Sequence, residues 1–285
     1  MILKIRLQDG LVILEDLLIK AKIPFRRTLT SMMLNFYYKP QAKKAVKQLP
    51  LIRKSKWDVL IILDACRFDY FSQEYKDSLD GDLTKAWSPA SNTFNWLKLV
   101  FPAFHNLTYV SANPGINSVG ISVYGYNAIK HFKRIIDVWD FGWDDKLGTI
   151  PPWNVNEATL KNLDDRMVIH YMQPHGPYIG ATRLPLPDFL SQATPRNTHQ
   201  LQADAFIARQ VKSGKISIEQ YQKAYRDNLT FTLGYVRKIL DKLPHRHIII
   251  TSDHGELLGE FGMFLHPVNV CAPILRQVPW LELQT

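Results

Sequence analysis

The sequence predicts an α/β fold, with three layers (α/β/α) around a mostly parallel sheet and a basic helical arm ahead of it. Three observations lead to this prediction. Residues 57–63 and 247–252 are short, mainly apolar runs, which are typical of strands buried on both faces of a parallel sheet. Helical patterns alternate with the expected strands, which favours parallel connections. Residues 1–56 hold 13 Lys/Arg against 3 Asp/Glu, a net charge of +10, whereas the remainder holds 22 against 23, a net of −1.

The expected elements follow one another along the whole chain. Residues 1–50 are expected to be helical and amphipathic, because leucines recur at helical spacing at Leu11, Leu14, Leu17 and Leu18. Strands are expected at residues 57–63, 108–111, 166–172 and 247–252, and helices at residues 66–80 (helix or loop), 94–99, 127–138 and 218–243. Between them we expect a turn at residues 88–93, a long packed loop at 139–156 and an irregular surface excursion at 181–200.

The uneven charge divides the chain into a basic amphipathic arm, residues 1–56, and a nearly neutral catalytic domain, residues 57–285. Aromatic side chains beside lysines, as from Phe36 to Lys39, are typical of segments at a membrane interface. The arm therefore fits anionic lipid, and an N-terminal helix packed on the domain explains the pattern equally well. Nucleic acid is not expected as a partner, because no nucleic-acid-binding module is recognisable.

Size, cysteine content and hydropathy predict the size of the core and the cellular location. The 285 residues, 46% of them hydrophobic, are enough for a large core. Cys66 and Cys271 are the cysteines, which excludes a disulfide framework and a cysteine-rich zinc site. No run reaches the ~18 apolar residues that span a bilayer, and the stretch from Leu11 to Ile19 lacks a signal-peptide cleavage site. We therefore expect a cytoplasmic protein, attached at most peripherally to the inner face of the membrane.

Candidate metal ligands stand directly after two of the expected strands. Asp64 follows the first strand, and Asp253 and His254 follow the last, with Gly255 next in sequence. Open α/β sheets bind ligands at the carboxyl edge, so these side chains converge if the two strands are neighbours. Carboxylates and imidazole suit a divalent cation. The alternative is that Asp64 or Asp253 caps the helix that follows it.

Three motifs give the sequence a resemblance to a known superfamily. They are Leu63-Asp64-Ala65-Cys66-Arg67, Gln173-Pro174-His175-Gly176-Pro177-Tyr178 and Ser252-Asp253-His254-Gly255-Glu256, with His266 further on. In order and approximate spacing they resemble the alkaline phosphatase superfamily. The most similar branch is the sulfatase-like one, which includes sulfatases and phosphoglycerol transferases of the lipoteichoic acid synthase type. The resemblance covers most of residues 57–280 and implies an alkaline phosphatase-like fold.

The resemblance implies a role for each matching residue. Asp64, Asp253 and His254 match ligands of the metal that the superfamily shares. The superfamily also needs a nucleophile at a helix N-terminus, where Thr93 is the best match and Ser91 the alternative. A metal-bound hydroxyl loses its proton easily, so Thr93 is also expected to bind the metal. Without the other motifs, either hydroxyl would be interpreted as a helix cap.

The resemblance extends to the substrate side of the pocket. His175 matches a histidine that contacts the substrate, or in some members a metal, and we expect it to take part in catalysis by proton transfer. His266 matches a later histidine of similar use, and Asn113 is expected to line the pocket. The expected cofactor is one divalent ion, Mn²⁺, Zn²⁺, Mg²⁺ or Ca²⁺. No Asp-x-x-x-His pair occurs around residues 170–177, so a second metal ion is doubtful.

Together these residues predict a metal-dependent hydrolase or transferase that acts on phosphate monoesters or diesters. The basic arm suggests a lipid-linked or glycan-linked anionic substrate, with residues 1–56 in contact with an anionic membrane. One alternative is a sulfuric-ester hydrolase without formylglycine, since Cys66 does not stand in a Cys-x-Pro-x-Arg pattern. Another is a non-catalytic member of the superfamily that binds an anionic glycan or lipid.

Overall fold

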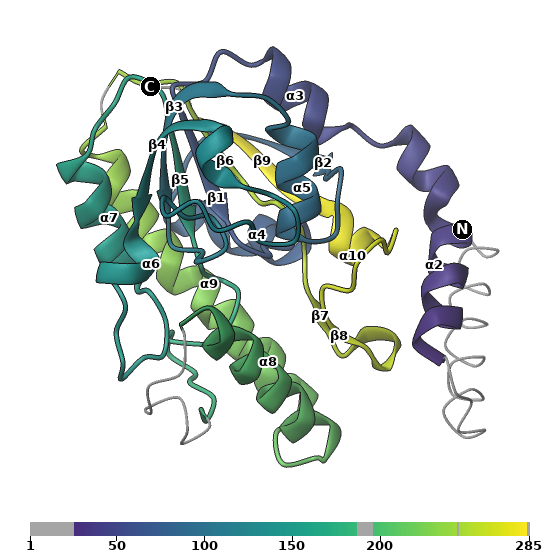
Figure 1. The fold of residues 1–285 in the computed structure, drawn as a ribbon. Helices are drawn as coiled ribbons and strands as arrows, with labels where there is room; N and C mark the ends of the chain where they lie inside the picture. The colour runs from purple at the N-terminus through teal and green to yellow at the C-terminus, as the bar shows by residue number, and fades with distance from the viewer. Residues whose placement is uncertain (1–25, 187–195, 244, 284–285) are drawn as a thin grey trace.

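The structure is a computed structural model that describes residues 26–186, 196–243 and 245–283 (Figure 1). A seven-stranded sheet has the order β2-β9-β6-β1-β5-β3-β4. The strands are β1 (Val59–Leu63), β2 (Asp82–Trp87), β3 (His105–Ser111), β4 (Phe132–Asp137), β5 (Met167–Tyr171), β6 (Ile248–Thr251) and β9 (Gln277–Leu283). The pairs from β6 to β4 are parallel, whereas β9 pairs antiparallel with β6 and with β2. The predicted α/β fold with a mostly parallel sheet is confirmed.

Helices lie on both faces of this sheet, and a small hairpin lies beside it. The helices are α2 (Arg26–Lys44), α3 (Gln48–Lys54), α4 (Phe68–Glu74), α5 (Thr93–Val100), α6 (Val138–Phe141), α7 (Pro152–Lys161), α8 (Arg196–Lys212), α9 (Ile218–Leu240) and α10 (Pro273–Arg276). Single 3-10 turns are η1 (Tyr75–Asp77), η2 (Ala128–Lys130) and η4 (Glu260–Gly262). The hairpin strands β7 (Leu257–Leu258) and β8 (Phe264–Leu265) pair with each other.

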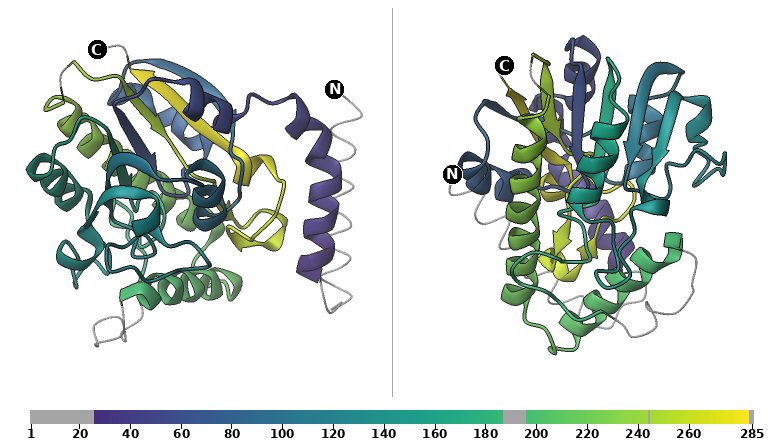
Figure 2. Two further views of the ribbon diagram at one scale, coloured as in Figure 1. Left: turned by 45° about the horizontal axis from the view of Figure 1, so that its top comes forward. Right: turned by 90° about the vertical axis from the view of Figure 1, so that its left-hand side faces the viewer.

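The central strand β1 shows how the layers are held together. All of its residues are buried, and successive side chains point to opposite faces of the sheet. Val59, Ile61 and Leu63 pack in a cluster with side chains of α4, α7 and α9. Leu60 and Ile62 pack in a second cluster with side chains of α3 and α5. Figure 2 shows these helices on the two sides of the sheet. Coverage on both faces explains the unbroken apolar run in the sequence.

Several elements differ from the sequence prediction. The prediction of a helix at residues 127–138 is wrong, because this segment forms η2 and the edge strand β4, whose exposed and buried residues follow no clear period. Residues 139–156 are not one loop, since they include most of α6 and the start of α7. Within the expected excursion, residue 196 begins α8, and residues 187–195 lie outside the described residues. The predicted leucine face at residues 11–18 also lies outside them.

The described part of the arm is in contact with the domain. Leu34 and Tyr38 of α2 are buried in an apolar cluster with Leu275. Gln48 of α3 is buried, and its side-chain amide donates a hydrogen bond to the Ser252 carbonyl (2.6 Å), next to the predicted metal ligands. The division of the chain at residue 56 stays a prediction. Among the described residues, no helix combines the length and the hydropathy that crossing a bilayer requires.

Candidate active site

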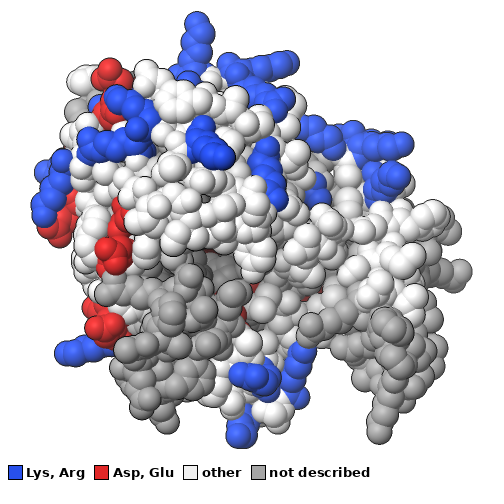
Figure 3. Space-filling model, viewed as in Figure 1, with Lys and Arg blue, Asp and Glu red and all other residues white. Residues whose placement is uncertain are grey.

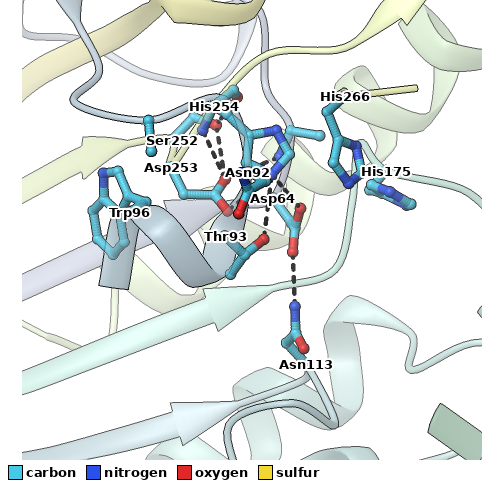
Figure 4. Close-up of polar contacts among 12 residues, drawn as sticks. Asp64, Asn92, Thr93, Trp96, Asn113, His175, Ser252, Asp253, His254 and His266 are labelled. Carbon is cyan, nitrogen blue, oxygen red and sulfur yellow. Dashed lines mark hydrogen bonds and ion pairs between the residues drawn. The ribbon is translucent and has the colours of Figure 1, made fainter. Parts of the chain in front are cut away.

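Two strand ends meet at the carboxyl edge of the sheet. β1 and β6 are parallel neighbours, with Ile62 in register with Thr251. Asp64, Asp253 and His254 follow these strands and are buried, and one ligand atom from each lies within 4.8 Å of the other two. The Nε2 atom of His254 is 3.2 Å from Asp253 Oδ2 and 3.8 Å from Asp64 Oδ1. The two strands are therefore neighbours, as the convergence of these three side chains required (Figure 4).

Backbone hydrogen bonds tie the two strand ends together. Ala65 has a positive φ of 58°, and its N–H donates to Asp253 Oδ1 (3.1 Å). The Cys66 N–H donates to the Ser252 hydroxyl (2.8 Å). The turn after Asp64 is thus held by the residues that follow β6. Burial raises the pKa of the Cys66 thiol well above its usual value, which suits a structural residue rather than a nucleophile.

The expected nucleophile lies at the first turn of α5, beside these ligands. Thr93 Oγ1 is 3.2 Å from His254 Nε2, and Thr93 is only 6% exposed. The helix cap is Asn92, whose side chain accepts a backbone N–H hydrogen bond in the first turn (3.0 Å), so Thr93 is not needed as a cap. The Ser91 hydroxyl instead donates to the Pro267 carbonyl (2.8 Å). Of the two candidate hydroxyls, Thr93 is the one directed at the ligands.

This set of donors fits a divalent cation. We call Asp64, Thr93, Asp253 and His254 the inner cluster. Among the described residues, none donates a hydrogen bond to the buried Asp253 Oδ2, although His254 Nε2 lies 3.2 Å from it. A buried carboxylate oxygen in that state is costly unless a cation lies nearby. Two carboxylates, an imidazole and a hydroxyl are hard or borderline ligands of the kind that Mn²⁺, Zn²⁺ and Mg²⁺ accept. The inner cluster could therefore hold the one ion that the sequence predicts.

Histidines favour the charged form of Asp64. Burial alone would raise the pKa of this carboxyl group, but the hydrogen bond and charge of His170, with contributions from His175 and His254, hold it well below its usual value. The His170 Nε2 atom is 3.3 Å from Asp64 Oδ2. Asn113, expected from the sequence to line the pocket, donates a hydrogen bond to the same oxygen (3.2 Å). Asn113 therefore orients a predicted ligand.

A second group of ligand-type side chains adjoins the first. His175, Glu256 and His266 each offer an atom within 4.8 Å of the others. His266 Nδ1 is 3.2 Å from Glu256 Oε2, and His175 Nε2 is 3.6 Å from a carboxylate oxygen of Asp204 on α8. We call these four residues the outer cluster. The ring centroids of His254 and His266 are 4.4 Å apart, so the two clusters are in contact through these rings (Figure 4).

The outer cluster combines opposite charges in a buried place. Burial lowers the pKa of His175, but the carboxylates of Asp204 and Glu256 outweigh it, so the pKa is raised. Burial raises the pKa of Asp204, and the nearby histidines offset this only in part. Burial likewise opposes ionisation of Glu256, yet the positive charges of His266 and His175 lower its pKa. The protonated imidazoles therefore already offset the charges of the two carboxylates.

Four contributors to the site were not predicted from the sequence. Glu256 stands inside the Ser-Asp-His-Gly-Glu motif, which was the available signal. His170 lies within β5, where it resembles an ordinary strand residue, and no motif marks Asp204. Asn228 of α9 is buried, and its amide group donates to the carbonyls of Pro174 and His175 (3.1 and 3.2 Å). Asn228 thereby fixes the loop that carries His175.

Comparisons with known proteins identify structural relatives. No protein-family model matches the sequence, and no curated protein is similar to it in sequence. The soluble domain of lipooligosaccharide phosphoethanolamine transferase A from Neisseria meningitidis matches with a TM-score of 0.51 and 13% identity, over 85% of this chain and 80% of that one. The C-terminal periplasmic domain of a phosphoethanolamine transferase from Campylobacter jejuni matches with a TM-score of 0.48 and 17% identity, over 79% and 78%. A phosphonate monoester hydrolase from Silicibacter pomeroyi matches with 0.44 and 12%, over 79% and 67%.

These structures belong to the alkaline phosphatase superfamily, sulfatase-like branch, and the resemblance predicted from the three motifs is confirmed at the level of the fold. The prediction of a cytoplasmic location is wrong. Matching structures include C-terminal periplasmic domains of phosphoethanolamine transferases from Campylobacter jejuni and Escherichia coli, which a cytoplasmic location did not anticipate. Two cysteines without a disulfide are compatible with either compartment, so composition could not decide the location.

Proposed function

We propose that this chain is a metal-dependent phosphotransferase or hydrolase acting on phosphate monoesters or diesters. The observation that carries the proposal is the position of the Thr93 hydroxyl, at the N-terminus of α5 and 3.2 Å from His254 Nε2. A nucleophile, a buried set of metal ligands and a helix N-terminus that favours negative charge occur together, as phosphoryl transfer requires. Matches to transferases and hydrolases of one superfamily support an enzyme that acts on esters.

The residues of both clusters would share the chemistry. A divalent ion held by the inner cluster would supply Lewis-acid chemistry at the phosphoryl group and ease ionisation of the nucleophile. Thr93 Oγ1 loses its proton to water and attacks phosphorus, so that a new O–P bond forms as the bond to the leaving alcohol breaks. His175 or His266 gives the leaving oxygen a proton. The phosphothreonine then passes its phosphoryl group to an acceptor hydroxyl or to water, which regenerates Thr93.

The outer cluster narrows the substrate. The buried carboxylates of Asp204 and Glu256 lie next to the place where the phosphoryl group would bind, so we infer that this cluster takes a cation once His175 or His266 has given up its proton. A second divalent ion or an ammonium group of the substrate would both satisfy it. Phosphoethanolamine, which the matched transferases are named for, carries an ammonium close to phosphate. An aminoalkyl phosphate ester, linked to a lipid or a glycan, is therefore the substrate class that we propose.

The proposal is tested by measuring turnover and bound metal on the same samples. Thr93→Ala should lower turnover of an aryl phosphate by at least about 10³-fold, because the nucleophile is removed, while most of the metal stays bound. Asp253→Asn should lose metal and turnover together. Ser91→Ala removes a hydroxyl two residues away and serves as the matched control, with turnover expected within about tenfold of wild type. Elemental mass spectrometry gives the metal content and also separates one bound ion from two.

Each alternative predicts a different result in these assays. Wild-type turnover by the Thr93→Ala protein would exclude Thr93 as the nucleophile. Faster cleavage of an aryl sulfate than of the matched aryl phosphate would support the sulfuric-ester alternative. A metal-loaded wild-type protein that cleaves neither aryl ester nor a phosphoethanolamine lipid would support a non-catalytic binding protein. One bound ion together with saturable binding of phosphoethanolamine would assign the outer cluster to the substrate ammonium.

A further inference from the structure

We propose that the outward face of α2 docks on the surface of an anionic membrane. The uneven charge of the sequence pointed to the arm as a whole, and the structure narrows the candidate surface to one face of one helix. The proposal stands on exposed side chains of α2 and does not depend on the reaction at the two clusters.

Five side chains form a single stripe along α2. Leu29, Met32, Phe36, Lys39 and Lys43 are separated by three or four residues in turn, so they lie on one face of the helix. Leu29 is 40% exposed, Met32 63% and Phe36 86%, and both lysines are exposed. We call these five residues the outer stripe. It is apolar in its first half and basic in its second half.

The outer stripe is not the face of α2 that packs on the domain. Thr30, Leu34 and Tyr38, at intervals of four, form the opposite face of α2 and are buried. Leu34 and Tyr38 pack with side chains of the hairpin region and α10. A surface helix usually has one apolar face, which is directed at the core. The described residues leave α2 with a second one that is open to solvent, and contiguous exposed apolar surface of this kind is typical of interaction sites.

Charge identifies the partner. Figure 3 shows Lys and Arg gathered at the end of α2 next to α3. Lys44, the last residue of α2, adds a further cation at the basic end of the stripe. An anionic bilayer offers an apolar interior for Leu29, Met32 and Phe36 and phosphate groups for the lysines.

Other partners fit the outer stripe less well. Nucleic acid provides phosphates but no apolar phase for a ring as exposed as that of Phe36. A second copy of α2 packed along the stripe would have to bury Lys39 and Lys43 in the helix pair, at a cost in stability. A membrane surface accommodates both halves of the stripe at once, because lysine side chains reach the headgroups while apolar side chains enter the layer below them.

The position of α2 relates this surface to the site. Asn35, beside the buried face of α2, donates to the Asn269 carbonyl (2.9 Å) and accepts a hydrogen bond from the Cys271 N–H (2.5 Å). The segment that contains Asn269 and Cys271 leads back to His266 of the outer cluster. A membrane in contact with the outer stripe would therefore lie about one helix diameter, ~10 Å, from this segment.

Vesicle flotation of the full chain tests the proposal. The probes are vesicles of phosphatidylglycerol and phosphatidylcholine, and vesicles of phosphatidylcholine alone. We expect wild-type protein to float with the anionic vesicles, and Phe36→Glu to bind them at least about tenfold more weakly, because a charge that the lipid repels replaces an inserted ring. Phe104→Glu is the matched control: it makes the same change at a phenylalanine that is 61% exposed just before β3. It should float like wild type.

A lysine variant and solution measurements complete the test. Lys39→Gln combined with Lys43→Gln should weaken binding about tenfold and reduce its salt dependence. Circular dichroism establishes that each variant is folded. Equal flotation of Phe36→Glu and wild type would overturn the proposal, as would a wild-type protein that stays with neither vesicle. Unchanged flotation with a Phe36→Glu protein that turns from dimer to monomer would assign the stripe to a second copy. Unchanged flotation with loss of thermal stability would assign it to another segment of this chain.

Discussion

Gly255 shows how the absence of a side chain shapes the candidate site. A Cβ atom at this position would lie 2.0 Å from the Ile274 carbonyl oxygen of α10. The Gly255 N–H also donates to the Leu275 carbonyl (2.9 Å). The glycine is therefore required by the close approach of two backbones, and not by an unusual φ. The sequence shows only that Gly255 follows two candidate ligands, whereas the structure identifies the backbone that approaches it.

Gly255→Ala tests this reading of the motif. The added methyl group meets backbone rather than a flexible side chain, so α10 or the ligand turn must move. We expect the free energy of unfolding to fall by on the order of 2–4 kcal/mol, and metal affinity to fall with it because His254 and Glu256 are displaced. Urea denaturation and metal titration measure the two effects. Wild-type values for both would mean that the backbones can separate at no cost.

Asp164 is a residue whose charge should make stability depend on pH. Its carboxylate accepts hydrogen bonds from the Thr108 hydroxyl (2.7 Å) and from Lys133 (3.0 Å), which lower its pKa from 3.8 to about 2. A carboxyl group whose pKa is lower in the folded state stabilises the protein at any pH above its pKa in the unfolded chain. This stabilisation is lost as the pH falls from about 4 to about 2. Because the side chain is near solvent, the contribution is about 1 kcal/mol.

Asp164→Asn should therefore destabilise the protein at pH 7 and make little difference at pH 2. The quantity to measure is the difference in unfolding free energy between wild type and variant across that range, by denaturant titration at fixed ionic strength. Asp165→Asn, one residue away, is the control. A difference for Asp164→Asn that stays constant with pH would show that the side chain contributes through shape rather than charge.

At the scale of elements, strands that are buried on both faces of the sheet could be predicted from the sequence, and partly exposed edge strands could not. β1, β5 and β6 are buried on both faces, and their apolar runs are visible in the sequence. The edge strand β2 buries only its last two residues, and the edge strand β4 exposes Lys133 and Arg134, so neither shows a clear pattern. β9 lies between β2 and β6 but contains Pro279, which argues against an interior strand in a sequence.

The long helix α9 was predictable from its period, and it contains one residue that weakens it. Gly234 lies inside α9, and a Cβ atom there would have no atom within 4 Å. Gly234→Ala should therefore stabilise the protein by ~0.5–1 kcal/mol, because alanine loses less backbone freedom on folding. Thermal or urea unfolding measures the gain. Glycine-to-alanine substitution is thus expected to raise the free energy of unfolding at Gly234 and to lower it at Gly255. A lower free energy of unfolding for Gly234→Ala would contradict the open space around this position.

At the scale of the whole molecule, the two clusters differ in how far the sequence could reach them. Asp64, Asp253 and His254 of the inner cluster follow the adjacent strands β1 and β6 and stand in the quoted motifs, whereas Thr93 begins α5 outside them. The outer cluster joins residues that follow β5, β6 and β8 with Asp204 on α8, and no local pattern predicts that these four segments meet. The doubt about a second metal ion rested on a different observation, the lack of an Asp-x-x-x-His pair around residues 170–177. The cellular location also could not be derived from composition, because two cysteines without a disulfide are compatible with a reducing and with an oxidising compartment.

The hydrogen bonds of Asn35 have a practical consequence for anyone who wants a minimal catalytic protein. They join α2 to the segment from Asn269 to Cys271, and Ser91 joins the nearby Pro267 carbonyl to the start of the nucleophile helix. A chain that begins at residue 57 would lose these bonds, and also Gln48 of α3, whose amide donates to the Ser252 carbonyl next to Asp253. Activity lost on such shortening would report a misshapen pocket and would say nothing about lipid. Shortened forms should therefore begin no later than residue 26.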